Sequence, residues 1–534
     1  MTEVFDVAIV GFGPSGAVAA ALLGQAGLRV HVCDLQRGVY DRPRAVALDH
    51  EILRVFDQIG VLEQVEPWIE PFTDSEFLGV DGQLIKCMTT VAPPYPMAYP
   101  PSVVFSQPAV EAVLRDRVRA LPNVEVALGV ELVGLAQDGE VVTLQLRRPE
   151  GESEAAATTS VVARHVIGCD GASSRARSLV GIELEDLGFD EPWLVIDVLA
   201  NARGLARLPK VSMQYCEPDR PCSYVIGPRN HRRWEISLKQ DEDPQQMATT
   251  DGAWRALERW IGPQDGELWR QASYRFHALV AARWRAGRVF VAGDAAHQQP
   301  PFLGQGLCQG VRDVANLCWK LVAVNEGRAG DALLDSYGPE RKRHVQQLTA
   351  RIKGIGAVIC ERDLARARAR DDALLAACGG VVRPEPRQNV QPLLESALFA
   401  AVADADADAP GVGSLFPQPW IVQGSQRRRL DRLSGTGWRI VTDDVRIARA
   451  VPAPIAQCLR SRTVEVGALE APGALHEADG VLASWFSRHE CRAAIVRPDH
   501  YVHSVASTPA ELAGQLRRLS DRLAAPTPAF AGAS

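Results

Sequence analysis

A glycine-rich turn near the N-terminus constrains the fold of this 534-residue chain more than any other feature. The apolar run 5–10 is typical of a parallel strand buried on both faces, and the segment Gly-Phe-Gly-Pro-Ser-Gly at 11–16 follows it directly. A run of helix-forming residues at 17–26 then leads to a second apolar run at 28–33. This order predicts a βαβ unit that binds a dinucleotide at the start of its helix.

Each small residue of this turn has its own expected role. Gly11 permits the tight turn, Gly13 lets a pyrophosphate approach the backbone, and Gly16 allows close packing of the helix on the strand. Pro14 and Ser15 belong to the same turn, which leads into the helix start, where unpaired amides carry about half a positive charge. We therefore expect these residues to surround phosphate groups.

An acidic residue ends the second strand. Asp34, followed by Leu35, lies at the distance from the turn where a carboxylate accepts hydrogen bonds from the ribose hydroxyls of an adenosine. The same charge repels a ribose 2′-phosphate. The turn and the acid together leave NAD and FAD as the candidate ligands.

Composition limits the remaining classes of protein. A chain of this length predicts about two to four domains. With 46% hydrophobic residues and a net charge of −7, it has the composition of a soluble globular protein, without the clustered Lys and Arg that nucleic acid requires. Its 11 cysteines form no CxxC pair and no metal-ligand spacing, which favours free thiols, no metal site and a cytoplasmic location. We also expect neither a signal peptide nor a membrane span.

Two later segments help to decide between the two dinucleotides. The apolar strand within 288–297 delivers Asp294 to a turn of small residues, where a carboxylate can bind a polyol such as a ribityl chain. Gly304 and Gly306 then allow backbone amides to approach a flat ring that gathers negative charge on reduction. An ordinary strand-turn-helix with a capping aspartate is the alternative interpretation. The second segment, 170–177, reads Asp-Gly-Ala-Ser-Ser-Arg-Ala-Arg and also follows a strand.

The segments 11–16, 170–177 and 288–297, in their order along the chain, resemble the FAD fingerprints of the group A monooxygenases, the single-component flavoprotein aromatic hydroxylases. Within that group the chain is more similar to the 3-(3-hydroxyphenyl)propionate hydroxylases, through residues 42–49, 105–108, 232–235 and 301–308. The resemblance implies an α/β, Rossmann-like FAD-binding fold with an inserted antiparallel substrate sheet.

The resemblance also implies positions around the flavin. Arg44 is expected at the FAD pyrophosphate, Gln107 at the adenosine or ribityl portion, and Asp294 at the ribityl chain. Gly304 to Leu307 are expected to face the pyrimidine edge of the isoalloxazine. The full set of predicted cofactor-binding residues is Gly11, Gly13, Pro14, Ser15, Gly16, Asp34, Leu35, Arg44, Gln107, Asp170, Gly293, Asp294, Pro301, Gly304, Gln305, Gly306 and Leu307.

The reaction that the resemblance implies is hydroxylation of a phenol, for example one similar to 3-(3-hydroxyphenyl)propionate. NADH or NADPH would reduce FAD, and dioxygen would then form a flavin hydroperoxide that attacks the aromatic ring. Because the chain has no second GxGxxG segment, the nicotinamide is expected to bind transiently beside the flavin. The protein itself must exclude water, orient the ring and remove a phenolic proton.

Short alternating runs between 187 and 274 predict the antiparallel sheet that binds the substrate. Tyr215 and Tyr224 offer hydroxyl groups and Arg233 a bidentate fork, so these are the candidate substrate contacts. Half-buried sheet positions are the alternative for the two tyrosines. Histidine is a common general base, but the place of His297 within the fingerprint favours a structural role. The catalytic base is not identified.

The predicted domains are an FAD-binding domain at 1–186 and 275–380, a substrate sheet at 187–274, a linker at 381–417 and a C-terminal domain at 418–534. A long helix is predicted over 339–377, and prolines and small acidic residues mark the linker. The last domain resembles the thioredoxin-like domain of the phenol-hydroxylase branch, without a CxxC motif for redox chemistry. Its expected role is packing or subunit contact, which includes a homodimer.

Two other functions stay open at this point. A flavin-dependent halogenase shares the cofactor fold but usually carries a WxWxIP motif, which this chain lacks. A protein that binds flavin without turnover would carry the same fingerprints. Bleaching of the bound flavin by a nicotinamide under anaerobic conditions would exclude that second alternative.

Overall fold

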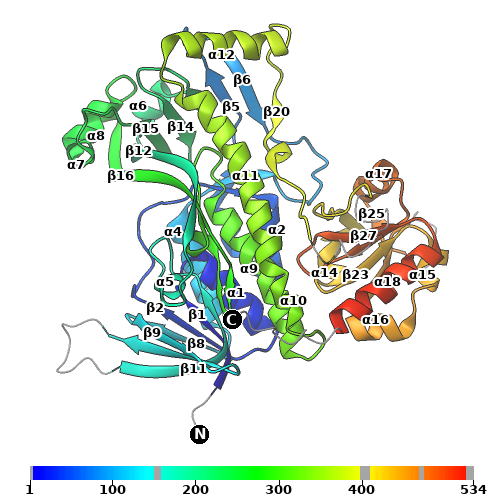
Figure 1. Ribbon diagram of the computed structural model, residues 1–534. Helices are drawn as coiled ribbons and strands as arrows, with labels where there is room; N and C mark the ends of the chain where they lie inside the picture. The colour runs from blue at the N-terminus through cyan, green and yellow to red at the C-terminus, as the bar shows by residue number, and fades with distance from the viewer. Residues whose placement is uncertain (1–3, 149–157, 397, 399–408, 468–473, 525–534) are drawn as a thin grey trace.

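The computed structural model describes residues 4–148, 158–396, 398, 409–467 and 474–524. Figure 1 shows one unit around a largely parallel sheet, a second unit around a wide, largely antiparallel sheet, and a C-terminal unit to one side. Parts of the predicted linker (397 and 399–408) and the end of the predicted C-terminal domain (468–473 and 525–534) lie outside the described residues.

The first sheet has eight strands and contains the predicted βαβ unit. Its order is β17-β18-β11-β1-β2-β8, and β10 and β9 extend it from β11. Strands β18, β11, β1, β2 and β8 are parallel to one another, and β1 is almost wholly buried, as its apolar sequence predicts. The strands are β1 (Val4–Val10), β2 (Val30–Asp34), β8 (Val124–Leu128), β9 (Glu131–Gln137), β10 (Val142–Arg147), β11 (Thr158–Gly168), β17 (Arg285–Ala286) and β18 (Val289–Val291).

Among the helices that share the main hydrophobic core with this sheet are α1 (Pro14–Gln25), α4 (Gln107–Arg119) and α9 (Gly306–Asn325). Alanines fill α1 because it is buried on most sides. Smaller elements complete this unit: α2 (His50–Gln58), α3 (Leu62–Val65), η1 (Glu66–Trp68), α5 (Arg175–Leu179), η3 (Gly293–Ala295) and a three-stranded sheet of β3 (Ala47–Asp49), β7 (Ser102–Phe105) and β4 (Ile69–Pro71).

The second sheet is wider than the range predicted for it. Its nine strands run in the order β19-β16-β12-β15-β14-β13-β5-β6-β20. Its middle strands come from the predicted range 187–274. One edge is extended by the β5–β6 hairpin from the N-terminal third and by the short strand β20 from the predicted linker. The strands are β5 (Ser75–Leu78), β6 (Leu84–Thr89), β12 (Leu184–Ala200), β13 (Ser212–Tyr215), β14 (Cys222–Ile226), β15 (His231–Ser237), β16 (Gly266–Ala281), β19 (His297–Gln298) and β20 (Glu385–Pro386).

Helices cover one face of this sheet. A separate core forms between its middle strands and the helical segment around α8. The elements on this side are α6 (Ala202–Arg207), α7 (Pro244–Met247), α8 (Thr250–Leu257) and η2 (Pro263–Asp265). The opposite face is left to meet the unit around the parallel sheet.

The predicted helix over 339–377 is two helices. α11 (Tyr337–Cys360) ends before Glu361, and α12 (Leu364–Ala377) begins after Asp363, whose side chain accepts a hydrogen bond from the amide of Arg366. In Figure 1, α11 runs past both large sheets and α12 lies across the β5–β6 end. The short α10 (Ala332–Asp335) precedes them, and η4 (Arg387–Val390) follows β20. No helix in the described ranges is long and apolar enough to cross a membrane.

The C-terminal unit has a four-stranded sheet in the order β24-β23-β26-β27. β23 and β24 are parallel, and the other two pairs are antiparallel. This strand order suits the thioredoxin-like fold, which stays a prediction. The elements are β21 (Trp420–Gln423), β22 (Gln426–Arg429), α14 (Leu430–Ser434), β23 (Arg439–Thr442), α15 (Val445–Arg449), α16 (Ala453–Leu459), β24 (Arg462–Glu465), β25 (His476–Glu477), α17 (Val481–Arg488), β26 (Ala493–Val496), β27 (Val502–Ala506) and α18 (Pro509–Ala524).

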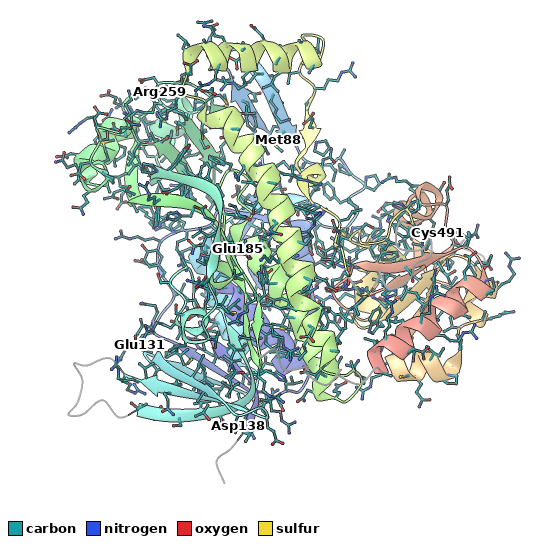
Figure 2. The ribbon with its side chains drawn as sticks, viewed as in Figure 1. Met88, Glu131, Asp138, Glu185, Arg259 and Cys491 are labelled. Atoms are coloured by element: carbon teal, nitrogen blue, oxygen red, sulfur yellow. The ribbon has the colours of Figure 1, made fainter. Side chains whose placement is uncertain are left out.

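Three labelled residues mark the positions of the three units. In Figure 2, Arg259 lies at the outer end of the unit around the antiparallel strands, Asp138 at the far end of the parallel-sheet unit, and Cys491 in the C-terminal unit beyond α11. Residues of α9 and of the loop after it contribute to the core that includes α18, so the C-terminal unit packs directly on the parallel-sheet unit.

Candidate functional site

A cavity of about 400 Å³ lies between the glycine turn, the loop before α9 and the second sheet. The predicted residues that line it are Gly13, Pro14, Ser15, Arg44, Gln107, Asp294, Pro301, Gly304, Gly306, Leu307 and Arg233. The predicted residues that do not line it are Gly11, Gly16, Asp34, Leu35, Asp170, Gly293, Gln305, Tyr215 and Tyr224. Gly171 and Ala172, next to Asp170, also line it, so the fold gathers residues from all three fingerprint regions at one place.

The three glycines of the first turn differ in their surroundings. Gly11 has a φ of +102°, and a Cβ there would lie 2.3 Å from the carbonyl oxygen of Cys169. A Cβ on Gly16 would lie 2.0 Å from the carbonyl oxygen of Gly11, so the helix contacts the turn directly. A Cβ on Gly13 would meet nothing within 4 Å. The backbone at Gly13 is thus open to the cavity.

The start of α1 has the character of an anion site. No side chain caps the amides of its first turn, which begins at Pro14. Arg44 lines the same cavity and has no carboxylate partner among the described residues, although its guanidinium lies 5.8 Å from the ring centroid of Tyr40. An uncapped helix start and an unpaired cation together fit a pyrophosphate.

Gln107 positions the segment that carries Arg44. Its side-chain oxygen accepts hydrogen bonds from the amides of Arg44, at 3.0 Å, and Ala45, at 2.6 Å. Gln107 is buried, and its amide nitrogen donates to Glu111 at 3.4 Å. The side chain lines the cavity, but its oxygen is already engaged with the protein backbone.

Asp34 is hydrogen-bonded to the backbone of the glycine turn. One carboxylate oxygen accepts a hydrogen bond from the amide of Phe12 and the other from the amide of Gln36, both at 2.6 Å. Leu35, next to it, is exposed. Each oxygen of Asp34 keeps a second lone pair for a ribose hydroxyl.

Asp170 acts inside its own loop. It accepts hydrogen bonds from the hydroxyl of Ser174 and, at 3.0 Å, from the amide of Ala176 at the start of α5. Burial raises the pKa of Asp170. Its neighbour Gly171 lines the cavity, while Arg177 binds the carbonyl oxygen of Ala295 at 3.0 Å. The third fingerprint is therefore joined to the second through a side-chain-to-backbone hydrogen bond.

Asp294 opens into the cavity. Its carboxylate accepts no hydrogen bond from the described residues, and burial raises its pKa. The preceding Gly293 has a φ of +61° and donates its amide to Asp313 at 2.9 Å. The Nε2 atom of His297 lies 2.8 Å from the same Asp313 oxygen, and its ring stacks on Trp284. These contacts suit the structural role predicted for His297 and leave Asp294 free for a ligand.

The loop before α9 supplies further free backbone groups. Gly304 has a φ of +64°, and no side chain caps the start of α9 at Gly306. Gln305, between them, turns the other way: it accepts a hydrogen bond from Arg312 at 3.1 Å and one from Gln391 at 2.9 Å. Gln305 lines a second cavity of about 200 Å³.

The strands β13, β14 and β15 form one wall of the cavity, called the sheet wall below, and neither predicted tyrosine faces it. Tyr224 is buried and its hydroxyl donates to the carbonyl of Pro209 at 3.3 Å, while the hydroxyl of Tyr215 accepts from Trp260 at 3.1 Å. Both tyrosines pack in the core around α8, on the opposite face from the cavity. Successive side chains of a strand point to opposite faces, so their neighbours face the cavity instead. Those neighbours are Ser212, Gln214, Ser223 and Val225.

Arg233 faces the cavity, but its guanidinium is occupied by the protein. It makes a bidentate pair with Asp197, at 2.7 and 3.0 Å. The same group donates to the carbonyl oxygens of Arg44 at 2.7 Å and Pro43 at 3.0 Å. Arg233 thus fixes the segment that carries Arg44 and is not the free fork that was predicted for a substrate.

Glu235 is a cavity residue that the sequence motif contained but that was not predicted as a site. It is buried, lies two residues after Arg233 on β15, and accepts no hydrogen bond from the described residues. Its nearest cation is Arg233, with 3.9 Å between Nη1 and Oε1. Burial raises the pKa of Glu235, with a further rise from Asp197 and a partial offset from Arg233 and Arg270.

Two other polar groups of the wall pair with each other. The hydroxyl of Ser223 donates to the side-chain oxygen of Gln214 at 2.5 Å, and both line the cavity. Period-two alternation along β13 and β14 would have found them if the face of the sheet had been known. Arg387, which also lines the cavity, lies in the predicted linker, where composition gave no signal.

These residues fit FAD. The open Gly13, the uncapped start of α1 and Arg44 suit its pyrophosphate, and the unpartnered carboxylate of Asp294 suits its ribityl hydroxyls. When bound, FAD supplies the electron and oxygen chemistry. The protein supplies the binding groups and the cavity beside them.

Comparisons with known proteins agree with this fit. The family profile described as the FAD binding domain matches residues 4–352, and the profile described as the HcaD C-terminal domain matches residues 413–522. The chain belongs to the family of FAD-dependent aromatic hydroxylases, the single-component flavoprotein monooxygenases.

Two curated relatives cover almost the whole chain. A Rhodococcus jostii protein named "Probable NADH-specific resorcinol 4-hydroxylase" is 36% identical over 96% of this chain and 94% of its own. A Burkholderia cenocepacia protein named as a 3-(3-hydroxy-phenyl)propionate/3-hydroxycinnamic acid hydroxylase is 32% identical over 93% of each. The crystal structure of the flavin-dependent monooxygenase PieE, with FAD and substrate, has the same fold, with a TM-score of 0.80, 22% identity and coverage of 98% of this chain and 100% of that one.

Proposed function

We propose that this chain uses NADH and dioxygen to hydroxylate a phenol, and that Glu235 accepts the phenolic proton. The observation that carries the proposal is a buried carboxylate without a hydrogen-bond donor on the sheet wall of the flavin cavity. Buried polar groups in proteins are nearly always hydrogen-bonded, so this carboxylate suits a donor brought by a ligand. A phenol is such a donor.

The position of Glu235 suits proton removal. It lines the same cavity as Gly304 and Leu307, the residues expected at the ring system of the flavin. Burial raises its pKa above that of an ordinary glutamate, which brings it closer to the operating pH at which a general base works best. Removal of the proton places negative charge on the ring and makes its carbon atoms more nucleophilic.

Other groups of the wall orient the ring. The Ser223–Gln214 pair offers a hydroxyl and an amide beside Glu235, because Ser223 on β14 is the registered partner of Glu235 on β15. Apolar side chains, among them Val225, Phe302 and Leu303, complete the lining and exclude water from the ring.

The nicotinamide is proposed to be NADH, on the strength of the name of the Rhodococcus relative. The names of both relatives, which are hydroxylases, favour hydroxylation over halogenation. We further propose a cytoplasmic enzyme that acts as a homodimer, without a nucleic-acid partner. Light scattering of the purified holoenzyme measures the oligomeric state directly.

The test combines turnover and product analysis. Wild-type holoenzyme is expected to oxidise NADH faster in the presence of a phenol and to yield the corresponding catechol or hydroquinone. Glu235→Gln is expected to retain FAD and to reduce with NADH, but to lose about 100- to 10,000-fold of the hydroxylation rate. Absence of any phenol-stimulated NADH oxidation in the wild type would refute the function. Full activity of Glu235→Gln would refute the role of Glu235 alone.

A further inference from the structure

Arg387 is a cation of the cavity that the flavin fingerprints leave unexplained. We propose that Arg387 binds an anionic substituent of the substrate, such as a carboxylate on a short side chain. The proposal rests on the proposed function and refines it, because it states that the phenol carries a negative charge at the end away from Glu235.

A comparison of the arginines that line the cavity isolates this residue. Arg233, Arg270 and Arg275 each have a carboxylate oxygen within 4.0 Å. Arg44 and Arg387 have none among the described residues. Arg44 is accounted for by the FAD pyrophosphate, which leaves Arg387 without a counter-charge.

The contacts of Arg387 hold it in place without neutralising it. Its Nη1 atom donates to the hydroxyl of Ser75 and its Nη2 atom to the carbonyl of Leu303, both at 3.2 Å. The guanidinium lies 4.0 Å from the ring centroid of Phe72. A guanidinium has five N–H donors, so three of them have no acceptor in the described part of the chain. A fixed fork with free donors matches the geometry of a carboxylate.

The electrostatic environment of Arg387 favours an anion. Burial lowers the pKa of Arg387 to about 10, so the group is still cationic at neutral pH. Asp49 is the carboxylate that raises the pKa of Arg387, and it is itself bound to Arg312. A charge that is buried without a partner is unfavourable, and an anionic ligand would relieve that cost.

The location of Arg387 favours a substrate group over the flavin phosphates. Its anchor Ser75, on β5, is the registered partner of Ser212 on β13, and both serines line the cavity. None of its contacts lies in the glycine turn or in the segment that carries Arg44. Arg387 therefore belongs to the sheet wall, where the substrate is proposed to bind.

The spacing of the wall suits an aromatic acid. Ser75 and Glu235 lie on strands separated by two others, β13 and β14, which corresponds to about 14 Å between backbones. Arg387 and Glu235 extend into this span from its two ends. The remaining space accommodates a phenol ring with a short carboxylate side chain, whose hydroxyl meets Glu235 and whose carboxylate meets Arg387.

A binding experiment with two matched ligands tests the proposal. 3-(3-Hydroxyphenyl)propionate and its uncharged amide are titrated into oxidised holoenzyme, and the change in flavin absorbance gives Kd for each. Wild type is expected to bind the acid more tightly than the amide. Arg387→Met is expected to weaken the acid by about 10- to 100-fold and to leave the amide within about 3-fold, as for loss of a charge-assisted hydrogen bond. Arg383→Met, an exposed arginine of the same segment, is the control and is expected to match wild type.

Arg387→Lys covers the case in which Arg387→Met does not fold, because lysine keeps the charge but not the fork. It is expected to lose a smaller part of the affinity for the acid, and none for the amide. Equal loss for both ligands in either variant, or equal affinity of the wild type for acid and amide, would overturn the proposal. Failure of the proposed function has a different signature, since the acid would bind but the wild type would form no hydroxylated product from any phenol.

Discussion

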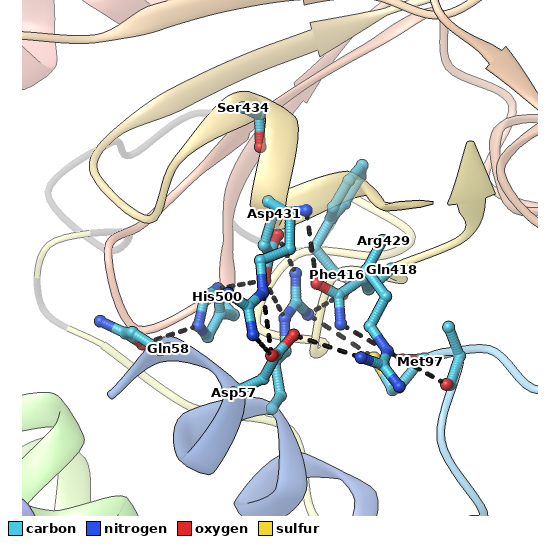
Figure 3. Close-up of polar contacts among 12 residues, drawn as sticks. Asp57, Gln58, Met97, Phe416, Gln418, Arg429, Asp431, Ser434 and His500 are labelled. Atoms are coloured by element: carbon cyan, nitrogen blue, oxygen red, sulfur yellow. Dashed lines mark hydrogen bonds and ion pairs between the residues drawn. The ribbon is translucent and has the colours of Figure 1, made fainter. Parts of the chain in front are cut away.

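Arg54 and Asp431 form a buried, bidentate ion pair between the FAD-binding unit and the C-terminal unit, with N–O distances of 2.6 and 2.9 Å. Arg54 also donates to the carbonyl of Phe416 at 2.5 Å, and Asp431 accepts from Arg439. Figure 3 shows this cluster, in which His500 lies beside Asp431. The C-terminal unit is thus fixed to α2 by charges that are removed from water.

Asp431→Ala is expected to destabilise the protein by about 3 to 5 kcal/mol, because it leaves Arg54 and Arg439 buried without their partner. Urea denaturation at pH 7 measures the change, and Asp521→Asn, an exposed position on α18, is the control. Burial raises the pKa of Asp431, but Arg54, Arg439 and His500 reverse this and hold it well below its ordinary value. A carboxylate whose pKa is lowered by folding stabilises the folded state at every pH above its pKa in the unfolded chain, which is about 4. This stabilisation is lost as the pH falls from that value toward the lower pKa of the folded state. A loss under 1 kcal/mol at pH 7 would contradict the assignment.

Two glycines of the first turn are expected to respond differently to alanine. Gly16→Ala places a methyl group 2.0 Å from the carbonyl of Gly11, so the apoprotein should lose about 1 to 3 kcal/mol or fail to fold. Gly13 has an ordinary φ of −71° and free space beyond it, so Gly13→Ala should leave the apoprotein stable. The new methyl group would instead occupy the approach to the pyrophosphate. Melting of apoprotein and FAD titration separate these effects, and normal FAD affinity in Gly13→Ala would count against the phosphate site.

The contrast between these glycines indicates what sequence alone could predict. The turn, its strand and its helix are local features, so the conformation of residues 11–16 could be predicted directly, as the close contacts at Gly11 and Gly16 show. Tyr224 and Ser223 are adjacent, and only the tertiary structure decides which of them faces the cavity. Arg387 comes from a segment without periodicity, and its position depends on the pairing of β20 with β6 far earlier in the chain. Long-range pairings of this kind leave no local pattern.

Ser223 and Tyr224 point to opposite faces of β14, and this difference suggests a second pair of variants. Ser223→Ala removes the hydroxyl that binds Gln214 in the cavity, so KM for the phenol is expected to rise by about 2- to 10-fold. Tyr224→Phe removes a hydrogen bond to Pro209 on the opposite face, so about 0.5 to 1.5 kcal/mol of stability should be lost with unchanged KM. Steady-state kinetics and thermal melting of both variants check the assignment. The reverse outcome would mean that the other face binds the substrate.

Asp34 is expected to affect FAD through its support of the turn and its lone pairs. Asp34→Ala removes acceptors for the amides of Phe12 and Gln36, and for a ribose hydroxyl, so FAD should bind about 10- to 100-fold more weakly. Asp138→Ala is a matched control, since Asp138 also accepts two backbone amides in a turn, at 3.1 and 3.0 Å, but far from the cavity. FAD content after gel filtration compares the two. Equal retention in both variants would contradict the role of Asp34.

The pH dependence of turnover provides a separate test of Glu235. A general base works only when it is ionised, so kcat/KM is expected to fall as the pH drops through the pKa of Glu235. Burial raises that pKa, so the acid limb should lie above the range of an ordinary glutamate, about 4.3. Glu235→Gln should lose the limb together with most of the rate, while Glu267→Gln, an exposed glutamate on β16 of the same sheet, should keep both. An acid limb that persists unchanged in Glu235→Gln would show that another group takes the phenolic proton, because glutamine cannot titrate.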